Sequence, residues 1–132
     1  MPSKRSSVGL WILGGIAVLM LMGKRAYGFT VKDQSVVVPP SEEMQYAADV
    51  VARVWQAHGF TAVLTSGLDG EHREDSLHYA GLATDWRTKN LPVSLKSGMI
   101  AEVRAILGRD FDVLLEYVGL PNEHMHIEFD PK

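Results

Sequence analysis

The stretch Asp69-Gly-Glu-His-Arg-Glu-Asp-Ser-Leu-His-Tyr-Ala-Gly-Leu-Ala-Thr-Asp85 is the most informative part of this 132-residue chain. It carries two imidazoles, His72 and His78, and ends on a carboxylate. Residues 82–87 alternate in polarity, which predicts a strand with Asp85 pointing to one face. An unpaired carboxylate in such a strand is costly unless it meets a cation or a metal ion. Two histidines with one carboxylate are a donor set that catalytic zinc uses.

A second stretch, Glu123-His-Met-His-Ile-Glu128, supplies further donors near the C-terminus. Read as a strand, it places His124, His126 and Glu128 on one face and apolar residues on the other. Two imidazoles on one strand face can also be a chance surface feature. Their combination with His78 and Asp85 favours a site that grips one ion from two directions.

The composition limits the class of protein. A length of 132 residues predicts one domain, and the net charge of -3 with a pI of about 5.9 argues against a nucleic-acid-binding surface. The chain has no cysteine, which excludes disulfides and thiolate metal sites.

Residues 1–28 are interpreted as an N-terminal signal-anchor or transmembrane segment. Residues 8–23 form an uninterrupted apolar run with basic residues on both sides. At about 1.5 Å per residue, a helix of this length falls slightly short of the roughly 30 Å hydrocarbon core. The alternative is a cleaved signal peptide, for which residues 26–28 offer small side chains. We expect an uncleaved anchor, with the rest of the chain on the extracytoplasmic side or exported.

The remaining pattern predicts an α+β domain. Residues 29–40 lack a helical period and end in two prolines, which indicates a linker. Residues 41–132 then show a helix that begins at Ser41 and stops at Gly59, a strand at 60–65, a strand at 82–87, a second helix ending near 107, and a hairpin of strands 111–116 and 124–129. We expect a small, mainly antiparallel sheet with two helices.

These motifs resemble a known family. The segment from Asp69 to Asp85 closely resembles the zinc-site segment of the hedgehog amino-terminal signalling domain. It is also similar to the Ser-x-His-x6-Asp motif of zinc D-Ala-D-Ala carboxypeptidases and phage endolysin peptidases. The run Leu-Leu-Glu116 followed by His124-x-His126 resembles the second half of the same site. The likeness covers roughly residues 41–130 and implies a hedgehog/DD-peptidase-like fold.

The resemblance also implies roles. His78, Asp85 and His126 would ligate zinc. Glu116 would be the general base that takes a proton from zinc-bound water. The two other histidines, His72 and His124, would lie beside the metal and stabilise the reacting oxygen by hydrogen bonds.

Two departures leave alternatives open. Glu123 stands three residues before His126, a spacing at which some of these peptidases place their catalytic acid, so Glu123 is a second candidate base. We favour Glu116, because Glu123 falls in a turn where exposed carboxylates are ordinary. The substrate-gripping Ser-Gly-Tyr-Arg segment is replaced by Ser66-Gly-Leu-Asp69, so carboxypeptidase and endopeptidase both remain possible. Asp69 matches a calcium-binding acid of hedgehog, but its acidic partners are largely missing.

The sequence therefore predicts a membrane-anchored or exported zinc metallopeptidase that hydrolyses amide bonds in peptidoglycan stem peptides, with the cell wall as substrate and no nucleic-acid partner. A phage lysis enzyme would need this combination. The alternative is a catalytically inactive, hedgehog-like zinc domain that acts as a binding module, since a fold does not establish an activity.

Overall fold

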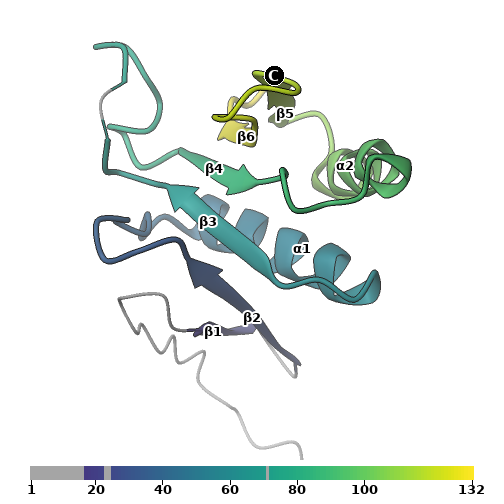
Figure 1. Cartoon of the computed structure of the whole chain (residues 1–132). Helices are drawn as coiled ribbons and strands as arrows, with labels where there is room; N and C mark the ends of the chain where they lie inside the picture. Colours follow the sequence, from purple (N-terminus) through teal and green to yellow (C-terminus); the bar gives the residue numbers. More distant parts are fainter. Residues whose placement is uncertain (1–16, 23–24, 71) are drawn as a thin grey trace, which may run out of the picture.

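The computed structural model describes residues 17–22, 25–70 and 72–132 (Figure 1). Its elements follow the order β1 (Ala17–Met22), β2 (Arg25–Val31), α1 (Glu42–Ala57), β3 (Ala62–Ser66), β4 (Ala83–Arg87), α2 (Val93–Leu107), β5 (Phe111–Glu116) and β6 (His124–Phe129). The predicted α+β class with two helices is confirmed within the described residues.

The strands form a single sheet in the order β1-β2-β3-β4-β6-β5. Strands β2 and β3 pair in parallel, and every other neighbouring pair is antiparallel. The sheet is therefore mixed but mainly antiparallel, as predicted. The β5–β6 hairpin has the predicted bounds, and it lies next to β4 in Figure 1.

Helix α1 begins where the sequence indicates. The hydroxyl of Ser41 accepts a hydrogen bond from the backbone N–H of Met44 over 3.3 Å, and two glutamates occupy the first turn. This arrangement caps free amides and suits the positive end of the helix dipole. Trp55, fully buried, anchors the other end of the helix in the core.

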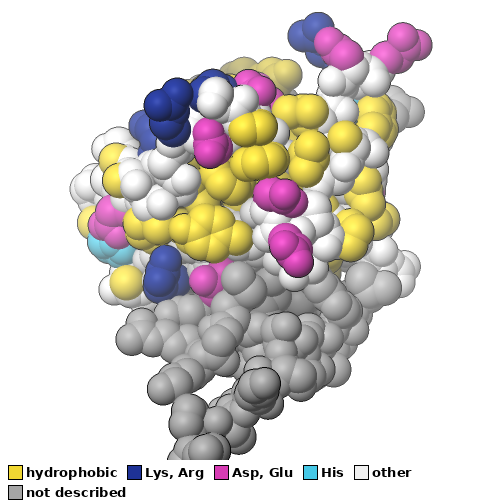
Figure 2. Space-filling model, turned by 180° about the vertical axis from the view of Figure 1, so that it is seen from behind, with side chains coloured by type: hydrophobic (Ala, Val, Ile, Leu, Met, Phe, Trp, Pro, Cys, Tyr) yellow, Lys and Arg dark blue, Asp and Glu magenta, His cyan; other side chains and the backbone are white. Residues whose placement is uncertain are grey.

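The core lies between the helices and one face of the sheet. Strand residues Trp86, Met125 and Ile127 are fully buried on this face and join the helix side chains in one apolar cluster. Because side chains alternate along a strand, Asp85 and His126 belong to the opposite face. Figure 2 shows the molecule from behind, where hydrophobic side chains gather in the middle of the face and acidic side chains lie among them.

The structure differs from the prediction at the N-terminal end of the domain. Residues 29–31, expected in the linker, form the end of β2 and pair with Ala62–Leu64 of β3. Phe29 is fully buried, and its ring meets that of Trp86 edge-on at 5.3 Å. Residues 29–31 therefore form a strand because Phe29 is buried in the core, although the local sequence shows no strand pattern. The linker begins at Lys32.

The predicted membrane segment, residues 1–28, lies largely outside the described residues. Where it is described, residues 17–22 and 25–28 belong to paired strands rather than to a helix. A short apolar run is compatible with a strand as well as a helix, so periodicity alone could not separate them. No helix in the described part of the chain has the length and apolar character to span a bilayer.

Candidate metal centre

The register of three strands brings the predicted donors together. Asp85 on β4 lies directly opposite His126 on β6. Two residues further along β6, His124 lies opposite Glu116 on β5. Residues paired in this way have neighbouring side chains on the same face, so antiparallel pairing alone places these four groups in one area.

His78 reaches the same area from the loop between β3 and β4. A turn holds it: Gly81 N–H donates to the His78 carbonyl over 3.0 Å, with Gly81 at φ +72°. Nδ1 of His78 lies 2.8 Å from the carbonyl oxygen of Gly67. A carbonyl only accepts, so Nδ1 carries the hydrogen and Nε2 is left for a ligand.

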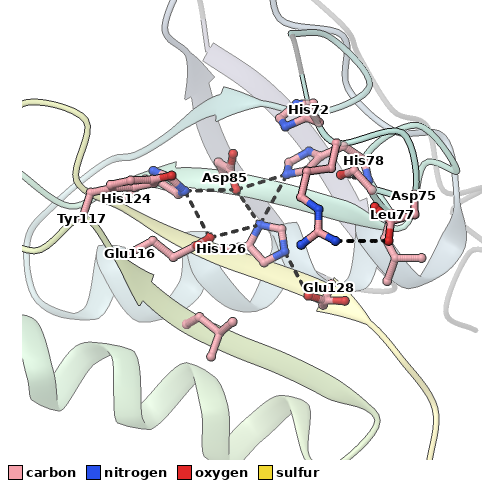
Figure 3. A pocket seen from close by; sticks show the side chains of 13 residues that line it. His72, Asp75, Leu77, His78, Asp85, Glu116, Tyr117, His124, His126 and Glu128 are labelled. Atoms are coloured by element: carbon pink, nitrogen blue, oxygen red, sulfur yellow. Dashed lines mark hydrogen bonds and ion pairs between the residues drawn. The ribbon is translucent and has the colours of Figure 1, made fainter.

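Three donor atoms form a tight triangle (Figure 3). Nδ1 of His126 lies 2.8 Å from Oδ1 of Asp85. Nε2 of His78 lies 3.3 Å from that same oxygen and 3.3 Å from Nδ1 of His126. The outer nitrogen of His126, Nε2, lies 3.2 Å from Oε1 of Glu128. Both histidines thus direct one nitrogen at the triangle and bond the other to an oxygen, which is how ligating histidines are oriented.

The charges of the triangle depend on one another. Burial disfavours the Asp85 carboxylate, but hydrogen bonds from His126 and His78 hold its pKa well below the ordinary range. Burial also opposes protonation of His126, yet the Asp85 carboxylate, with Glu116 and Glu128, raises its pKa. An ionised carboxylate surrounded by imidazoles is a place where a metal ion can replace a proton.

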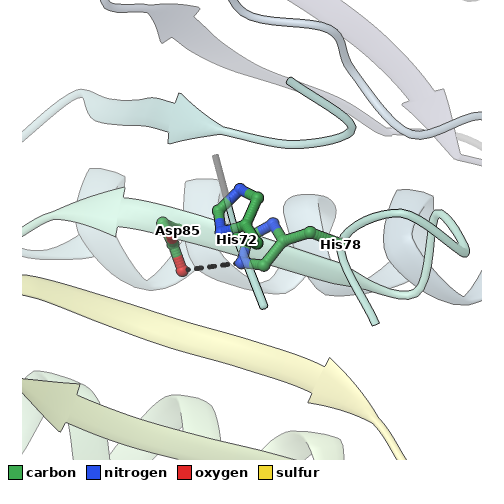
Figure 4. Close-up of side chains that lie close together, drawn as sticks. All are labelled: His72, His78 and Asp85. Atoms are coloured by element: carbon green, nitrogen blue, oxygen red, sulfur yellow. Dashed lines mark ion pairs between the residues drawn. The ribbon is translucent and has the colours of Figure 1, made fainter. Parts of the chain in front are cut away.

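His72 and His124 lie beside the triangle. The rings of His72 and His78 stack in parallel with centroids 3.9 Å apart (Figure 4). Nε2 of His72 lies 2.8 Å from the Asp69 carbonyl oxygen, so this ring supports His78 from the side. Nδ1 of His124 lies 2.8 Å from the carbonyl oxygen of Asn122, which turns its Nε2 toward Asp85 at 3.6 Å.

The carboxylate of Glu116 lies at the edge of the triangle. Its Oε1 is 3.4 Å from Nε2 of His124 and 3.8 Å from Nδ1 of His126. The side chain is 40% exposed, so water can reach it while it faces the donors.

The structure does not bring Glu123 to this site. Its carboxylate is buried and accepts hydrogen bonds from Lys96 Nζ at 2.8 Å, Thr88 Oγ1 at 2.6 Å and the Gly119 N–H at 3.0 Å. The expectation of an exposed turn residue is therefore wrong. Residue 123 precedes β6 on the side of Met125, so its side chain points toward α2 and away from the histidines.

A pocket of about 610 Å³ opens over the donors. Its lining contains all the predicted site residues except Glu123, and also Arg73, Asp75, Leu114, Tyr117 and Glu128. The sequence had already placed Glu128 on the strand face of His124 and His126, without giving it a role. It carried no signal for Tyr117, which belongs to an irregular loop.

Donor groups close enough to hold a metal ion occur here in two overlapping sets that share Asp85: one with His72 and His78, the other with Glu116 and His124. A third group, Asp112 with Glu128 and Asp130, has a different character. Lys132 Nζ lies 3.3 Å from Asp112 and 2.9 Å from Asp130. That cluster is balanced by its own cation, whereas the triangle consists of two imidazole nitrogens and one carboxylate oxygen within 3.3 Å of one another.

The sequence matches no protein-family model and no curated protein.

Proposed function

We propose that this chain is a zinc-dependent peptidase that hydrolyses amide bonds in peptidoglycan stem peptides. The observation that carries the proposal is the triangle of His78, Asp85 and His126 with Glu116 at its edge. The metal and the reaction follow from the chemistry of these groups. The substrate class rests on the resemblance of the two motifs.

The donor set fits zinc. In a tetrahedral site with zinc–donor bonds of about 2.0–2.1 Å, donor atoms lie about 3.3 Å apart. Two edges of the triangle measure 3.3 Å, and the third, between His126 and Asp85, measures 2.8 Å. Two imidazoles and one carboxylate leave the fourth position open, as catalytic zinc sites do. A zinc ion held there supplies a Lewis acid and lowers the pKa of water to about 7.

Glu116 performs the proton transfers in this proposal. Its carboxylate is partly exposed and lies beside the donor triangle, which supports the role of taking a proton from the attacking water. The same group then returns the proton to the amine that leaves as the amide bond breaks. His124 directs Nε2 into the same space; because Nδ1 donates to the Asn122 carbonyl, Nε2 can donate a hydrogen bond to the reacting oxygen when the ring is an imidazolium.

His72 has a supporting role in this scheme. Because its Nε2 is bonded to the Asp69 carbonyl and its ring stacks on His78, it keeps the ligand ring in place. The roles of the six groups therefore differ, although all lie within one pocket.

The test is hydrolysis by the full-length chain, purified in mild detergent and supplied with zinc. Purified peptidoglycan and defined stem peptides are incubated with it, and mass spectrometry reads the products. We expect zinc-dependent release of peptide fragments and a loss of at least about 100-fold in rate for Glu116→Gln. The matched control is Glu102→Gln, because Glu102 lies on α2 and pairs with His58.

Two results would count against the proposal. A folded, zinc-loaded protein that releases no fragment would favour the alternative, a hedgehog-like zinc domain that only binds. If the Glu116→Gln protein were as active as the Glu102→Gln protein, the peptidase activity would stand, but Glu116 would not be its general base.

A further inference from the structure

The connection between β5 and β6, residues 117–123, borders the pocket and is called the pocket loop below. Its first residue, Tyr117, lines the pocket next to Glu116, and its ring centroid lies 5.7 Å from that of His124. The loop is longer than the roughly two to five residues of common hairpin turns. A longer loop at this point has room to contact a bound molecule.

The backbone of Tyr117 is in an unusual conformation. Its φ of 54° makes it the one non-glycine residue with positive φ among the described residues. Residues other than Gly, Asn and Asp rarely adopt a positive φ. Those that do cluster at functional sites, where the strained backbone positions a side chain. Tyr117 is 53% exposed, so packing in the core does not explain the conformation.

Glu123 holds the other end of the pocket loop. Its carboxylate joins the Gly119 N–H to Lys96 of α2 and Thr88 beyond β4. Within the loop, the Leu120 N–H donates to the Tyr117 carbonyl over 2.9 Å. A buried carboxylate that accepts hydrogen bonds from a cation and two further donors holds these groups together, because leaving any of them without a partner costs free energy.

We propose that Tyr117 is a substrate-contacting residue of the pocket and that Glu123 is the positioning residue that holds the pocket loop in place. Tyr117 and Leu114, which is 48% exposed, form an apolar wall beside the donor triangle. This wall suits an uncharged, apolar side chain next to the amide bond to be cleaved, with the aromatic ring covering it. The inference rests on the proposed function, because the substrate contacted is the stem peptide.

The contact is tested by steady-state kinetics of the full-length, zinc-loaded chain on a soluble stem pentapeptide. We expect Tyr117→Ala to raise KM about tenfold, as truncation of an aromatic contact does, with zinc affinity unchanged. Val118→Ala is the matched control, since Val118 is 65% exposed in the same loop and does not line the pocket. Equal kinetics for the two variants would overturn the contact while leaving the peptidase intact.

The positioning role is tested without any need for catalysis. In amide hydrogen exchange, Glu123→Gln should speed exchange at Gly119 and Leu120 about tenfold or more and leave β4 protected, since only the loop loses its tie. Like Tyr117→Ala, it should also raise KM. In the double variant, KM should rise by less than the product of the two single increases, because both substitutions act on the same contact. Unchanged exchange at Gly119 would overturn the role of Glu123.

A second variant covers the case in which Glu123→Gln fails to fold. Gly119→Ala introduces a side chain at φ +78°, where no atom lies within 4 Å of the added carbon, so it strains the loop without a clash. It should raise KM with kcat retained, and a wild-type KM would contradict the inference. A zinc-loaded chain that binds no stem peptide would overturn the contact of Tyr117 together with the proposed function. The exchange measurement would still decide the role of Glu123.

Discussion

At the scale of single residues, the carboxylate of Glu128 is a sensitive probe of the donor triangle. It lies 3.2 Å from Nε2 of His126 and thereby orients the nitrogen that faces Asp85. Removing such a partner weakens metal binding by about 10–100-fold. We expect Glu128→Ala to weaken zinc affinity to this extent, measured by competition with a chromophoric chelator.

The neighbouring carboxylate of Asp130 provides the control for that measurement. Asp130 is 54% exposed at its side chain and pairs with Lys132, away from the histidines. Asp130→Ala should change zinc affinity little. Equal weakening by both variants would mean that negative charge near β6, rather than orientation of His126, determines the affinity.

Glu123 allows a test of stability against pH. The hydrogen bond from Lys96, followed by that from Thr88, lowers its pKa from the ordinary 4.5 to about 2. A carboxyl group whose pKa is depressed by folding stabilises the protein above the ordinary pKa, and the stabilisation is lost as the pH falls toward the folded value. We expect Glu123→Gln to cost about 2 kcal/mol at pH 6 in urea unfolding.

That cost should shrink between pH 4.5 and 2, the interval over which Glu123 itself becomes protonated. Comparing wild type with the variant at each pH cancels the titration of the other carboxylates, Asp85 included. A difference independent of pH would mean that the pKa of Glu123 is the same in the folded and the unfolded protein, which would contradict its lowering by Lys96 and Thr88.

The residue types predicted a cluster of donors around Asp85, because a carboxylate inside an alternating strand needs a partner. Four histidines were candidates, and only the resemblance to zinc peptidases selected His78 and His126 among them. Glu123 was misplaced for a physical reason: its exposure depends on how α2 packs and where Lys96 points. Neither is encoded in the local pattern around residue 123.

At the scale of elements, the chain segment between β2 and α1 is tied to the loop that carries His78. Oδ1 of Asp69 accepts hydrogen bonds from the N–H groups of Val37 at 2.7 Å and Gly67 at 2.9 Å. The Leu68 N–H donates to the Val37 carbonyl over 2.9 Å. This close approach leaves no room for a side chain at residue 67.

We therefore expect Gly67→Ala to destabilise the protein by about 2–3 kcal/mol, since overpacking against backbone is costly. An added Cβ would lie 2.1 Å from the Val37 carbonyl oxygen. Zinc affinity should fall as well, because the Gly67 carbonyl orients His78. Thermal unfolding and chelator competition measure the two effects.

Gly98 provides the opposite case within α2. Its added Cβ would meet no atom within 4 Å, and it lies inside a helix. Gly98→Ala should stabilise the fold by about 0.5–1 kcal/mol. If Gly67→Ala stabilised the fold as Gly98→Ala does, the close approach of Val37 to Gly67 would be contradicted.

Local patterns predicted most elements but neither β1 nor β2. The capped helix α1 and the β5–β6 hairpin have periodicities and stop signals that lie within the elements themselves. Strand β2 pairs in parallel with β3, which lies some thirty residues further along the chain. A pairing of that range has no signature in the segment alone, and β propensity depends on the neighbours that the fold supplies.

At the scale of the whole molecule, the helices cover one face of the sheet and the donors occupy the other. Phe29 belongs to the covered side, where its ring packs on Trp86, the neighbour of Asp85 in β4. The segment first interpreted as a linker is therefore part of the support of the site.

We expect Phe29→Ala to cost about 3–5 kcal/mol, the usual effect of removing a buried aromatic ring. Val37→Ala is the control, since Val37 is 48% exposed and its side chain should contribute within about 0.5 kcal/mol. Urea unfolding of the full-length chain measures both. If both substitutions changed the free energy of unfolding by the same small amount, residues 29–31 would not be part of the core and the linker interpretation would hold.

The central claim is that His78, Asp85 and His126 hold one zinc ion. The most direct measurement is a crystal structure of the zinc-loaded protein with anomalous diffraction at the zinc edge. We predict one strong peak at about 2.0–2.2 Å from Nε2 of His78, Oδ1 of Asp85 and Nδ1 of His126. A peak bound instead by Asp112 and Asp130, or no peak in the pocket at saturating zinc, would contradict the claim.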